Sequence, residues 1–463
     1  MSETTEVVPK KGLPRLVAST GDIYQTAITE SHAREEAALN GSIGNGLNYR
    51  TIIGPKSNQP NSNIFRSAEW TSDGTTLVAV TEDNCVRTFI VPPDLLTSPD
   101  PQTLLPYSIS PLPTTPYCIS PYPFFSLSDP STTLFLTSLH SQPIHLRSLL
   151  YPHIAATYPL IHPTTEKYLV PNSLTWTPTG THFLAGTDSQ IHLFDVSRVN
   201  SGPMETFTTG KKRKSKSSTT PTFSSSSVDF RNGSNSSVRS IISTLAIHPV
   251  TNNLAAGTYS RRVLLYSSPY QDGELYSVIN LNSLPDRFKS TARGNGITSI
   301  SFADGLGNRI IIAERKSEVV YCYDLRYTSE PWAVLTGRKA ATNQKLGVSF
   351  APVYGDRTNV VLAGGTDGIV NIWEPFASSG SVGDGGESNI FIKPVDSFSA
   401  ANDPVTSVAV HASGAVVATS SGERKSLKSG HPETQDSGTD EDDDKGDTPE
   451  DSLWDNGVRV WTV

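Results

Sequence analysis

The stretch SLTWTPTGTHFLAGTDSQIHLFDVS, from Ser173 to Ser197, alternates apolar and polar residues in three short runs. The first run ends on Trp176 before a turn that contains proline, the second is rich in small residues, and the third follows a tight polar turn. Period-two alternation interrupted by turn residues is typical of strands in an antiparallel sheet. The stretch therefore predicts three consecutive β-strands of one small sheet.

This unit recurs along the chain. Close copies begin at Ile241, Gly296 and Leu346, and weaker copies begin near Phe65, Tyr122 and Val405. Equivalent first-strand residues are Trp70, Phe125, Trp176, Ile247, Phe302, Phe350 and Val410. Their spacings of 55, 51, 71, 55, 48 and 60 residues, less the visible loops, approach the roughly 40–45 residues of a four-stranded WD-type blade. We therefore predict an all-β, seven-bladed WD40-type propeller over residues 63–463.

The seventh copy ends in NGVRVWTV, which supplies its third strand and leaves the fourth missing. Residues 13–27, LPRLVASTGDIYQTA, are the natural donor, because pairing them there hides an open sheet edge. The rest of the N-terminal segment 1–62 is expected to be a flexible linker. Its GSIGNG run at residues 41–46 follows no convincing strand, so we interpret it as linker rather than as a phosphate-binding loop.

Three segments interrupt the repeat. Residues 92–130 contain eleven prolines and are expected to form an irregular connection between the first two blades, with a polyproline ligand as the alternative. Residues 201–237 are rich in serine and threonine around the basic run KKRKSK. Residues 422–456 are polar and then acidic, and we expect them to be disordered.

Composition limits the class of protein. Cys85, Cys118 and Cys322 show no C-x-x-C spacing, which supports neither a disulfide framework nor a zinc site. No apolar run approaches the roughly 20 residues of a membrane helix, so a soluble intracellular protein is expected. Residues 440–451 carry eight acids and one lysine, or −7 of the net charge of −8. Any nucleic-acid site must therefore be a local basic patch.

Catalysis is not indicated. The motifs G-x-S-x-G, H-E-x-x-H and the P-loop are absent from the sequence. His140 and His145 are the only nearby histidine pair inside one predicted blade, and a turn with Pro143 separates them. We interpret both as blade surface rather than metal ligands, and expect no enzyme activity, cofactor or metal.

Cations are expected to gather on one edge of the ring. Strands of an antiparallel blade alternate in direction, so the turns between second and third strands lie on the same face as the connections between blades. In units four to six, these turns and connections supply Arg261, Arg262, Arg315, Lys316, Arg287, Lys289, Arg293, Arg338, Lys339 and the run Thr342, Asn343 and Gln344.

Such a sector is suited to RNA, because cations neutralise phosphates and amides read unstacked bases. We expect Arg315 and Lys316 to position the RNA, and Asn343 and Gln344 to read it. The alternative is an ordinary solvated propeller rim.

Two charged runs lie in the insertions. KKRKSK, with Lys211, Lys212, Arg213, Lys214 and Lys216, is interpreted as a nuclear-import signal, with a generic basic loop as the alternative. The acidic residues 440–451 are predicted on the same edge as the basic sector. They either compete with RNA for its cations or form a solvating tail.

From about Asn63 onward, the chain resembles the telomerase Cajal body protein family of WD-repeat proteins. The resemblance is densest in ERKSEVVYCYDLR and PWAVLTGRKAATNQ, which contain Arg315, Lys316, Arg338 and the T-N-Q run. RSAEWTSDGTTLVAVTEDNCVRTFIVPP and PIHLRS are similar to the family's first two blades. SFADGLGN, from Ser301, departs from the family's usual aromatic-His-Pro-Asp-Gly-Asn turn.

The resemblance implies a nuclear, Cajal-body propeller that binds a short box in the terminal loop of small guide RNAs and of telomerase RNA. It would direct their localisation and ribonucleoprotein assembly. We expect a monomeric, non-enzymatic RNA-binding protein of this kind. The alternative is a WD40 scaffold associated with spliceosomal small nuclear ribonucleoproteins or pre-mRNA splicing.

Overall fold

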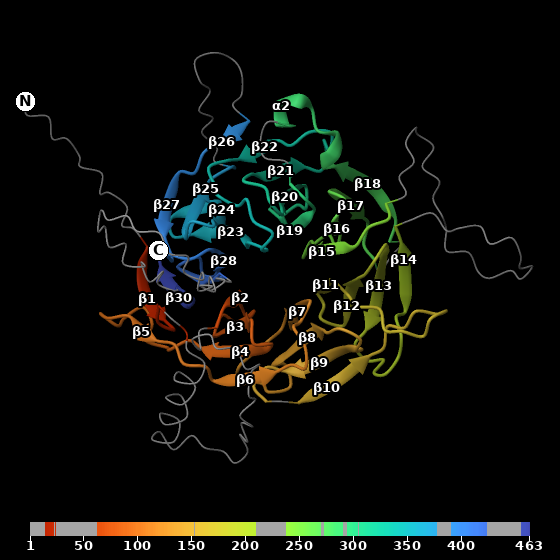
Figure 1. Ribbon diagram of the computed structural model, residues 1–463, viewed down its shortest axis with the longest axis horizontal. Coiled ribbons are helices and arrows are strands. Elements are labelled where there is room, and N and C mark those ends of the chain that lie inside the picture. Colours follow the sequence, from red (N-terminus) through yellow and green to blue (C-terminus); the bar gives the residue numbers. More distant parts are fainter. Residues whose placement is uncertain are drawn as a thin grey trace, which may run out of the picture.

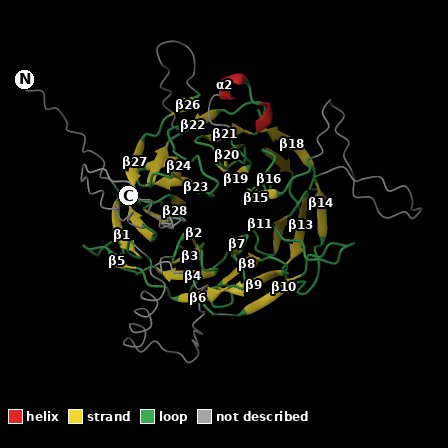
Figure 2. Ribbon diagram, viewed as in Figure 1, coloured by secondary structure: helices red, strands yellow, loops and turns green. Residues whose placement is uncertain are grey.

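The protein is a ring of seven small antiparallel sheets around one axis (Figure 1). The computed structural model describes residues 14–22, 24, 63–151, 153–209, 238–269, 273–289, 294–303, 305–376, 390–423 and 455–463. Almost all regular structure in the described residues is strand, and the short helical segments lie at the outside of the ring (Figure 2). The predicted seven-bladed, all-β propeller is confirmed.

Blades 1 to 4 have four strands each, named a to d from the centre outwards. Blade 1 consists of β2 (Phe65–Trp70), β3 (Thr76–Thr81), β4 (Cys85–Ile90) and β6 (Ser108–Pro111). Blade 2 consists of β7 (Cys118–Pro121), β8 (Leu134–Ser138), β9 (Ile144–Ser148) and β10 (Ile154–Tyr158). Blade 3 consists of β11 (Ser173–Trp176), β12 (His182–Gly186), β13 (Gln190–Asp195) and β14 (Glu205–Thr208). Blade 4 consists of β15 (Ile242–Ile247), β16 (Leu254–Thr258), β17 (Arg262–Tyr266) and β18 (Leu275–Asn280).

Blades 5 and 7 carry a fifth strand at the outer edge. Blade 5 consists of β19 (Ile297–Phe302), β20 (Arg309–Glu314), β21 (Val320–Asp324), β22 (Ala333–Leu335) and β26 (Phe391–Ile392). Blade 6 consists of β23 (Val348–Tyr354), β24 (Arg357–Gly364), β25 (Ile369–Trp373) and β27 (Asp396–Ser399). Blade 7 consists of β28 (Val405–Val410), β29 (Val416–Ser421), β30 (Val458–Thr462), β1 (Arg15–Ser19) and β5 (Gln102–Thr103). The 3-10 helix η1 (Leu281–Ser283) and the helix α2 (Asp286–Lys289) follow β18.

The N-terminal strand closes the ring, as predicted. β1 pairs antiparallel with β30, with Arg15 opposite Thr462 and Ser19 opposite Arg459. The amide of Thr20 donates to the carbonyl of Val458 at 3.0 Å, which extends the ladder beyond the strand. β5 then covers the free side of β1 in parallel, so an edge that would attract another strand is paired.

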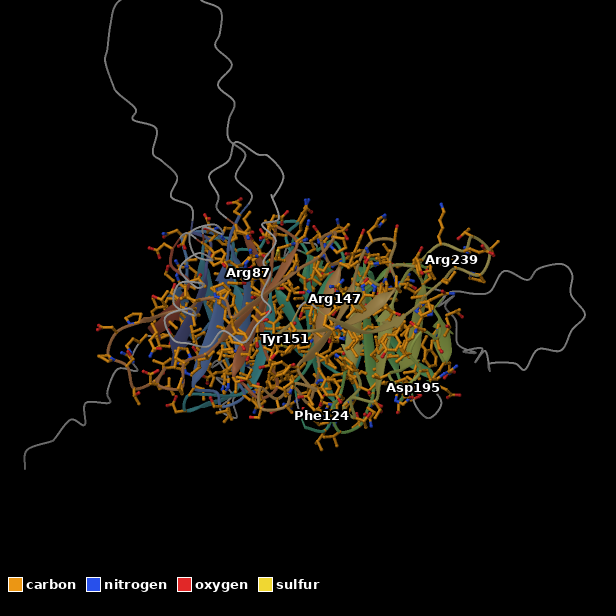
Figure 3. The ribbon with its side chains drawn as sticks, turned by 90° about the horizontal axis from the view of Figure 1, so that it is seen from below. Arg87, Phe124, Arg147, Tyr151, Asp195 and Arg239 are labelled. Carbon is orange, nitrogen blue, oxygen red and sulfur yellow. The ribbon has the colours of Figure 1, made fainter. Side chains whose placement is uncertain are left out.

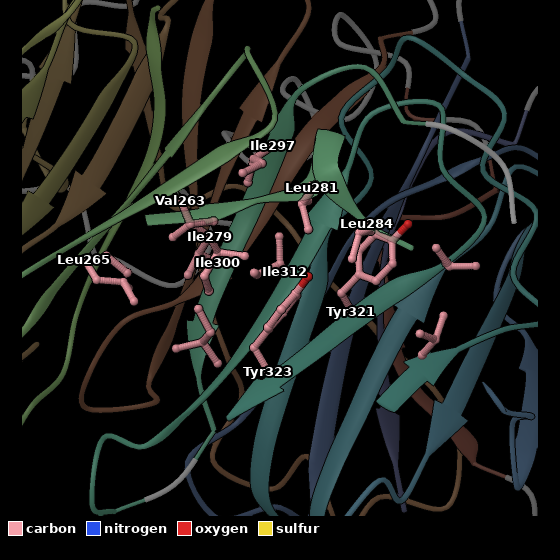
Figure 4. Packing of buried hydrophobic residues seen from close by; sticks show 14 of the residues in the cluster. Val263, Leu265, Ile279, Leu281, Leu284, Ile297, Ile300, Ile312, Tyr321 and Tyr323 are labelled. Atoms are coloured by element: carbon pink, nitrogen blue, oxygen red, sulfur yellow. The ribbon is translucent and has the colours of Figure 1, made fainter. Parts of the chain in front are cut away.

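The hydrophobic core is distributed between the blades. Seven clusters of buried apolar side chains in the described residues each fill one contact between neighbouring blades. Between blades 4 and 5, Val263 and Ile279 pack with Ile300, Ile312 and Tyr323 (Figure 4). Each blade is therefore stabilised by its two neighbours, and no blade has a core of its own.

Small residues in the second strands let the blades approach closely. A Cβ atom added to Gly257 in β16 would lie 2.7 Å from Cγ2 of Ile297, in the first strand of the next blade. One added to Gly186 in β12 would lie 2.7 Å from Cγ2 of Ile242 in the same way. Such separations are far below ordinary carbon contacts, which explains the small-residue run found in each sequence repeat.

The structure corrects the proline-rich segment and one first-strand residue. Residues 92–130 are more than an irregular connection, because they include β5, β6 and β7. Phe125 lies after the first strand of blade 2, which ends at Pro121. Prolines at strand ends and edges had hidden these strands, since proline removes a ladder donor and lowers the strand signal.

The other two insertions also overlap the fold. β14 (Glu205–Thr208) lies inside residues 201–237 and is the outer strand of blade 3. Asp455 and Asn456, at the end of residues 422–456, are 4% and 0% exposed. The basic run at 211–216, the GSIGNG run at 41–46 and the acidic run at 440–451 lie outside the described residues.

Histidines in two third strands are buried. His145 in β9 is 7% exposed, which corrects its assignment to the blade surface, whereas His140 is exposed. His192 in β13 is 3% exposed and lies within hydrogen-bond distance of Thr187 and Thr206. Burial lowers the pKa of each of the two buried rings to about 4, because the charged form loses its hydration.

Acidification should therefore destabilise the propeller. Because the unfolded chain binds protons at these two sites near pH 6.5 and the folded chain only near pH 4, stability falls as pH drops through this window. Between about pH 7.5 and pH 5, we expect each histidine to lower the unfolding free energy by about 1–2 kcal/mol. Chemical denaturation across this range measures the loss. The variant His192→Gln should lose correspondingly less on acidification, and an unchanged pH profile would contradict the assignment.

Removal of the closing strand should destabilise the ring as a whole. Val17, Ala18 and Tyr24 are at most 1% exposed, and their loss would expose apolar surface of blades 1 and 7. Deleting residues 1–24 should lower the unfolding free energy by about 3–6 kcal/mol, a large part of the stability of a typical domain. Deleting residues 1–13 is the matched control and should leave the melting temperature unchanged. Equal stability of the two truncated proteins would refute this role of β1.

Candidate functional site

One edge of the ring carries all the turns between strands b and c together with the connections between blades. We name it the b–c edge, and the opposite side the a–b edge. The amide of Lys316, in the b–c turn of blade 5, donates to the carbonyl of Thr342, in the connection to blade 6, at 3.1 Å. In the side view, Arg239 of a connection lies opposite Phe124 and Asp195 of a–b and c–d turns (Figure 3). The b–c turns and the connections between blades therefore share one edge.

The connection between blades 5 and 6 is tied to three b–c turns. Besides the contact with Lys316, the carbonyl of Lys339 accepts from the amide of Thr366 in blade 6 at 2.8 Å. Nε2 of Gln344 donates to the carbonyl of Gly422 in blade 7 at 3.1 Å. Thr342 Oγ1 accepts from the amide of Gln344 at 3.1 Å. The loop is thus fixed before any ligand arrives.

The three residues of the T-N-Q run have different roles in this loop. Gln344 and Thr342 are half-buried and use side-chain atoms to hold the loop, whereas Asn343 is exposed. Of the two residues predicted to read bases, the structure presents Asn343 to a ligand and uses the amide nitrogen of Gln344 as an anchor.

Arg261 has a structural partner. Its Nε donates to Oε1 of Glu314 at 2.6 Å and its Nη2 donates to Oε2 at 2.9 Å. The Glu314 side chain is fully buried, and its hydrogen bonds raise the pKa of Arg261 above the usual value. Since the guanidinium is neutralised between blades 4 and 5, we remove Arg261 from the predicted RNA contacts.

Arg315 and Lys316 remain available at the next turn. The Arg315 guanidinium lies 5.2 Å from the ring centre of Tyr259 in the b–c turn of blade 4. Its Nε is buried and finds no acceptor among the described residues. Lys316 is exposed, in a left-handed conformation with φ of 56°. Neither forms an ion pair with an acid of the described chain.

Arg338 is a buried cation without an acid. It is 4% exposed, and its Nε and Nη1 have no hydrogen-bond partner in the part of the chain described. Burial lowers its pKa to about 10. An unpaired buried charge is costly, so the site favours an anionic acceptor from outside. We name Arg315, Lys316 and Arg338 the basic patch.

The other predicted cations are not part of the basic patch. Arg262 is half-buried at the start of β17, and Lys339 pairs with Asp367 at 3.4 Å. Arg287 pairs with Glu330, which lies in the c–d turn of blade 5, so it does not belong to the b–c sector. Arg293 lies outside the described residues.

Two ionisable side chains on the inner part of the ring, Glu69 and Lys345, influence each other's pKa. Glu69 belongs to β2, the innermost strand of blade 1, and burial raises its pKa to about 7 while Lys345 lowers it. Lys345, just before β23, keeps an exposed side chain although blades surround it, and this enclosure lowers its pKa. The charge of Glu69 raises the pKa of Lys345, and the charge of Arg315 lowers it.

No group of three or more His, Cys, Asp or Glu that could bind a metal occurs in the described ranges. Cys85, Cys118 and Cys322 are free thiols. Within the same ranges, no helix has the length and apolar character needed to cross a lipid bilayer.

Comparisons with known proteins agree with the fold. Residues 162–195 match the family model described as WD domain, G-beta repeat. Human telomerase Cajal body protein 1 is 25% identical over 372 residues, which cover 80% of this chain and 58% of that protein. The cattle protein of the same name is also 25% identical, over 368 residues.

Over most of its length the chain is thus similar to WD-repeat proteins that carry the name telomerase Cajal body protein 1. A fission yeast protein from Schizosaccharomyces pombe, named guanine nucleotide-binding protein negative regulator 1, is 29% identical over 340 residues. That match covers 72% of this chain and 75% of the yeast protein. The chain spans less than three fifths of the human family member.

Sequence reasoning missed Tyr259, Lys345 and the burial of Arg338. Tyr259 stands two positions before Arg261 in the same turn, so an aromatic beside cations was a usable signal. Lys345 directly follows the T-N-Q run, but only the ring brings it near Glu69. No feature of the neighbouring sequence predicts that Arg338 is buried.

Breaking the Arg261–Glu314 pair should destabilise the contact between blades 4 and 5. Either Arg261→Met or Glu314→Gln leaves an unmatched buried group, and we expect a loss of about 3–5 kcal/mol in unfolding free energy. The double variant should lose less than the sum, because neither charge is then left alone. Urea denaturation of all four proteins measures the coupling. Strictly additive losses would show that the two side chains do not act as a pair.

Proposed function

We propose that the b–c edge of blades 4 to 6 binds a small nuclear RNA and that the propeller directs this RNA into a ribonucleoprotein. The single observation that supports this most strongly is the basic patch. Arg315 and Arg338 each have buried guanidinium nitrogens without acceptors in the described chain, and Lys316 is exposed beside them. Phosphate oxygens supply acceptors of the required charge and geometry.

Different residues of the site would position the RNA backbone and recognise a base. Arg315, Lys316 and Arg338 would neutralise backbone phosphates and release counterions, which gives affinity without sequence preference. Asn343 is exposed on the anchored loop that also carries Arg338. Its amide offers a donor and an acceptor to the edge of an unstacked base. Thr342 and Gln344 would act by holding this loop, and Arg262 and Arg293 are retained as further proposed RNA contacts.

The RNA class follows from the family. A relative carries the words telomerase and Cajal body in its name, and the sequence resemblance points to box-bearing guide RNAs, with telomerase RNA as a further client. We propose localisation in the nucleus, including the Cajal body, with import through Lys211, Lys212, Arg213, Lys214 and Lys216. The propeller would act as a non-enzymatic assembly factor.

A protein-interaction scaffold is the second candidate, and the a–b edge favours it. Trp332 is 45% exposed and stacks on Phe376 at 5.3 Å, with the Arg309 guanidinium over both rings. Half-exposed tryptophan and arginine are frequent anchors of protein interfaces. A spliceosomal ribonucleoprotein partner, or a partner such as the name of the yeast relative suggests, would bind this edge without involving the basic patch.

Charge reversal in the basic patch tests the proposal. The double variant Arg315→Glu with Lys316→Glu should bind box-bearing guide RNA at least about tenfold more weakly, because phosphate contacts are lost and repulsion is added. The slope of log affinity against log salt should become shallower by about 0.7 for each lost contact with single-stranded RNA. Fluorescence anisotropy over a salt series measures both.

The matched control reverses two cations in c–d turns of the a–b edge, Arg198→Glu with Arg326→Glu. It changes net charge equally and should keep most of the affinity. Equal affinity of the patch variant and the unmodified protein would end this site assignment and favour the scaffold.

A further inference from the structure

A groove opens on the b–c edge between blades 2 and 3, away from the basic patch. It has a volume of about 500 Å³, within the range of small-ligand sites. The residues that line it are His140, Ser141, Glu166, Lys167, Tyr168 and Val170. His140 and Ser141 come from the b–c turn of blade 2, and the others come from the connection to blade 3.

One wall of the groove is a preformed hairpin in this connection. Ile161 and Tyr168 form an antiparallel bridge. The amide of His162 donates to the carbonyl of Lys167 at 2.9 Å. The amide of Leu169 donates to the carbonyl of Leu160 at 2.8 Å. Glu166 adopts φ of 55° at the tip. Because hydrogen bonds already fix this wall, a ligand would not have to order it.

The groove presents aromatic rings to solvent. Tyr168, on the hairpin, is 39% exposed. On the other wall, the His140 ring stacks on Tyr117 with ring centres 6.5 Å apart, and Tyr117 is 52% exposed. Exposed rings on both sides of a groove of this size are suited to a flat aromatic ligand, since every nucleobase has a face that stacks on such rings.

We propose that this groove, which we name the stacking groove, holds an unpaired base of the RNA whose backbone binds the basic patch. The inference rests on the proposed function, because it assigns a second contact on the same edge to the same ligand. It concerns blades 2 and 3, which the predicted RNA site did not include.

The charges of the stacking groove favour a base over a phosphate. Glu166 lines it and would repel a phosphate, but its carboxylate accepts hydrogen bonds from the amino and imino groups of base edges. Lys167, next to it on the hairpin, is exposed and can contact the phosphate that joins the bound nucleotide to its neighbour. Stacking inside and a cation at the margin match the way single-stranded RNA is bound.

Tyr168→Ala removes one aromatic wall, and Tyr168→Phe is the matched control that retains the ring. Binding of a short single-stranded RNA of mixed sequence should weaken by about 5- to 150-fold in the alanine variant, the effect expected for loss of one stacked base. The phenylalanine variant should bind like the unmodified protein. Tyr168 is partly exposed, so thermal melting should be unchanged in both.

A second measurement does not depend on a variant. The same RNA with thio-substituted uridines is crosslinked by light to the unmodified full chain, and the crosslinked peptides are identified. We expect crosslinks to peptides that contain Tyr117 or Tyr168. Unaltered affinity of Tyr168→Ala together with no crosslink at these peptides would overturn the proposal, as would occupancy of the groove by a peptide.

The two RNA contacts are distinguishable. If charge reversal at Arg315 and Lys316 abolishes RNA binding, but Tyr168→Ala has no effect and no crosslink forms at the groove peptides, the stacking groove is refuted and the basic patch stands. If Tyr168→Ala weakens binding and the charge reversal does not, the basic patch is refuted and the groove stands.

Discussion

The ladder between β1 and β30 is the contact on which the remaining architecture depends. Each blade is stabilised only by its neighbours, because the buried clusters lie between sheets rather than within them. In a closed ring of this kind every blade packs against two neighbours. In an open ring the two terminal blades each pack against only one. The hydrogen bonds of Arg15 to Ser19 with the last strand therefore stabilise blades 1 and 7 directly and the other blades through them.

Closure also decides which charged side chains become neighbours. The b–c edge collects loops from the whole length of the chain, but the structure gives their cations different tasks. Arg261 forms an ion pair with Glu314, and this pair joins blades 4 and 5. Arg338 is enclosed without an acid, and Arg315 lies over Tyr259 with one nitrogen unpaired. Cations of similar appearance in the sequence are thus divided into a structural pair and a set available for a ligand.

The part of the fold that depends on local pattern was predictable. Strand alternation, small residues in second strands and the missing fourth strand of the last repeat gave the number of blades and the donor of the closing strand. β7 was missed because its strand ends in proline within a proline-rich run. The pairing of Arg261 with Glu314, 53 residues later, and the enclosure of Arg338 depend on how neighbouring blades dock. Sequence pattern carries no information on these contacts, so side-chain availability was the least predictable property of the site.

The closing ladder also imposes an order on biosynthesis. Thr20 and Val458, which are hydrogen-bonded to each other, are 438 residues apart in the chain. The first strand leaves the ribosome long before its partner exists, and the unpaired edge must remain out of reach of other strands until then. Strands a to d of blades 1 to 6 can form in turn as their residues emerge, whereas the outer strand β26 of blade 5 is synthesised only after β25 of blade 6. The ring becomes continuous only when β30 has left the ribosome, so the closing ladder forms after every other described strand has been synthesised.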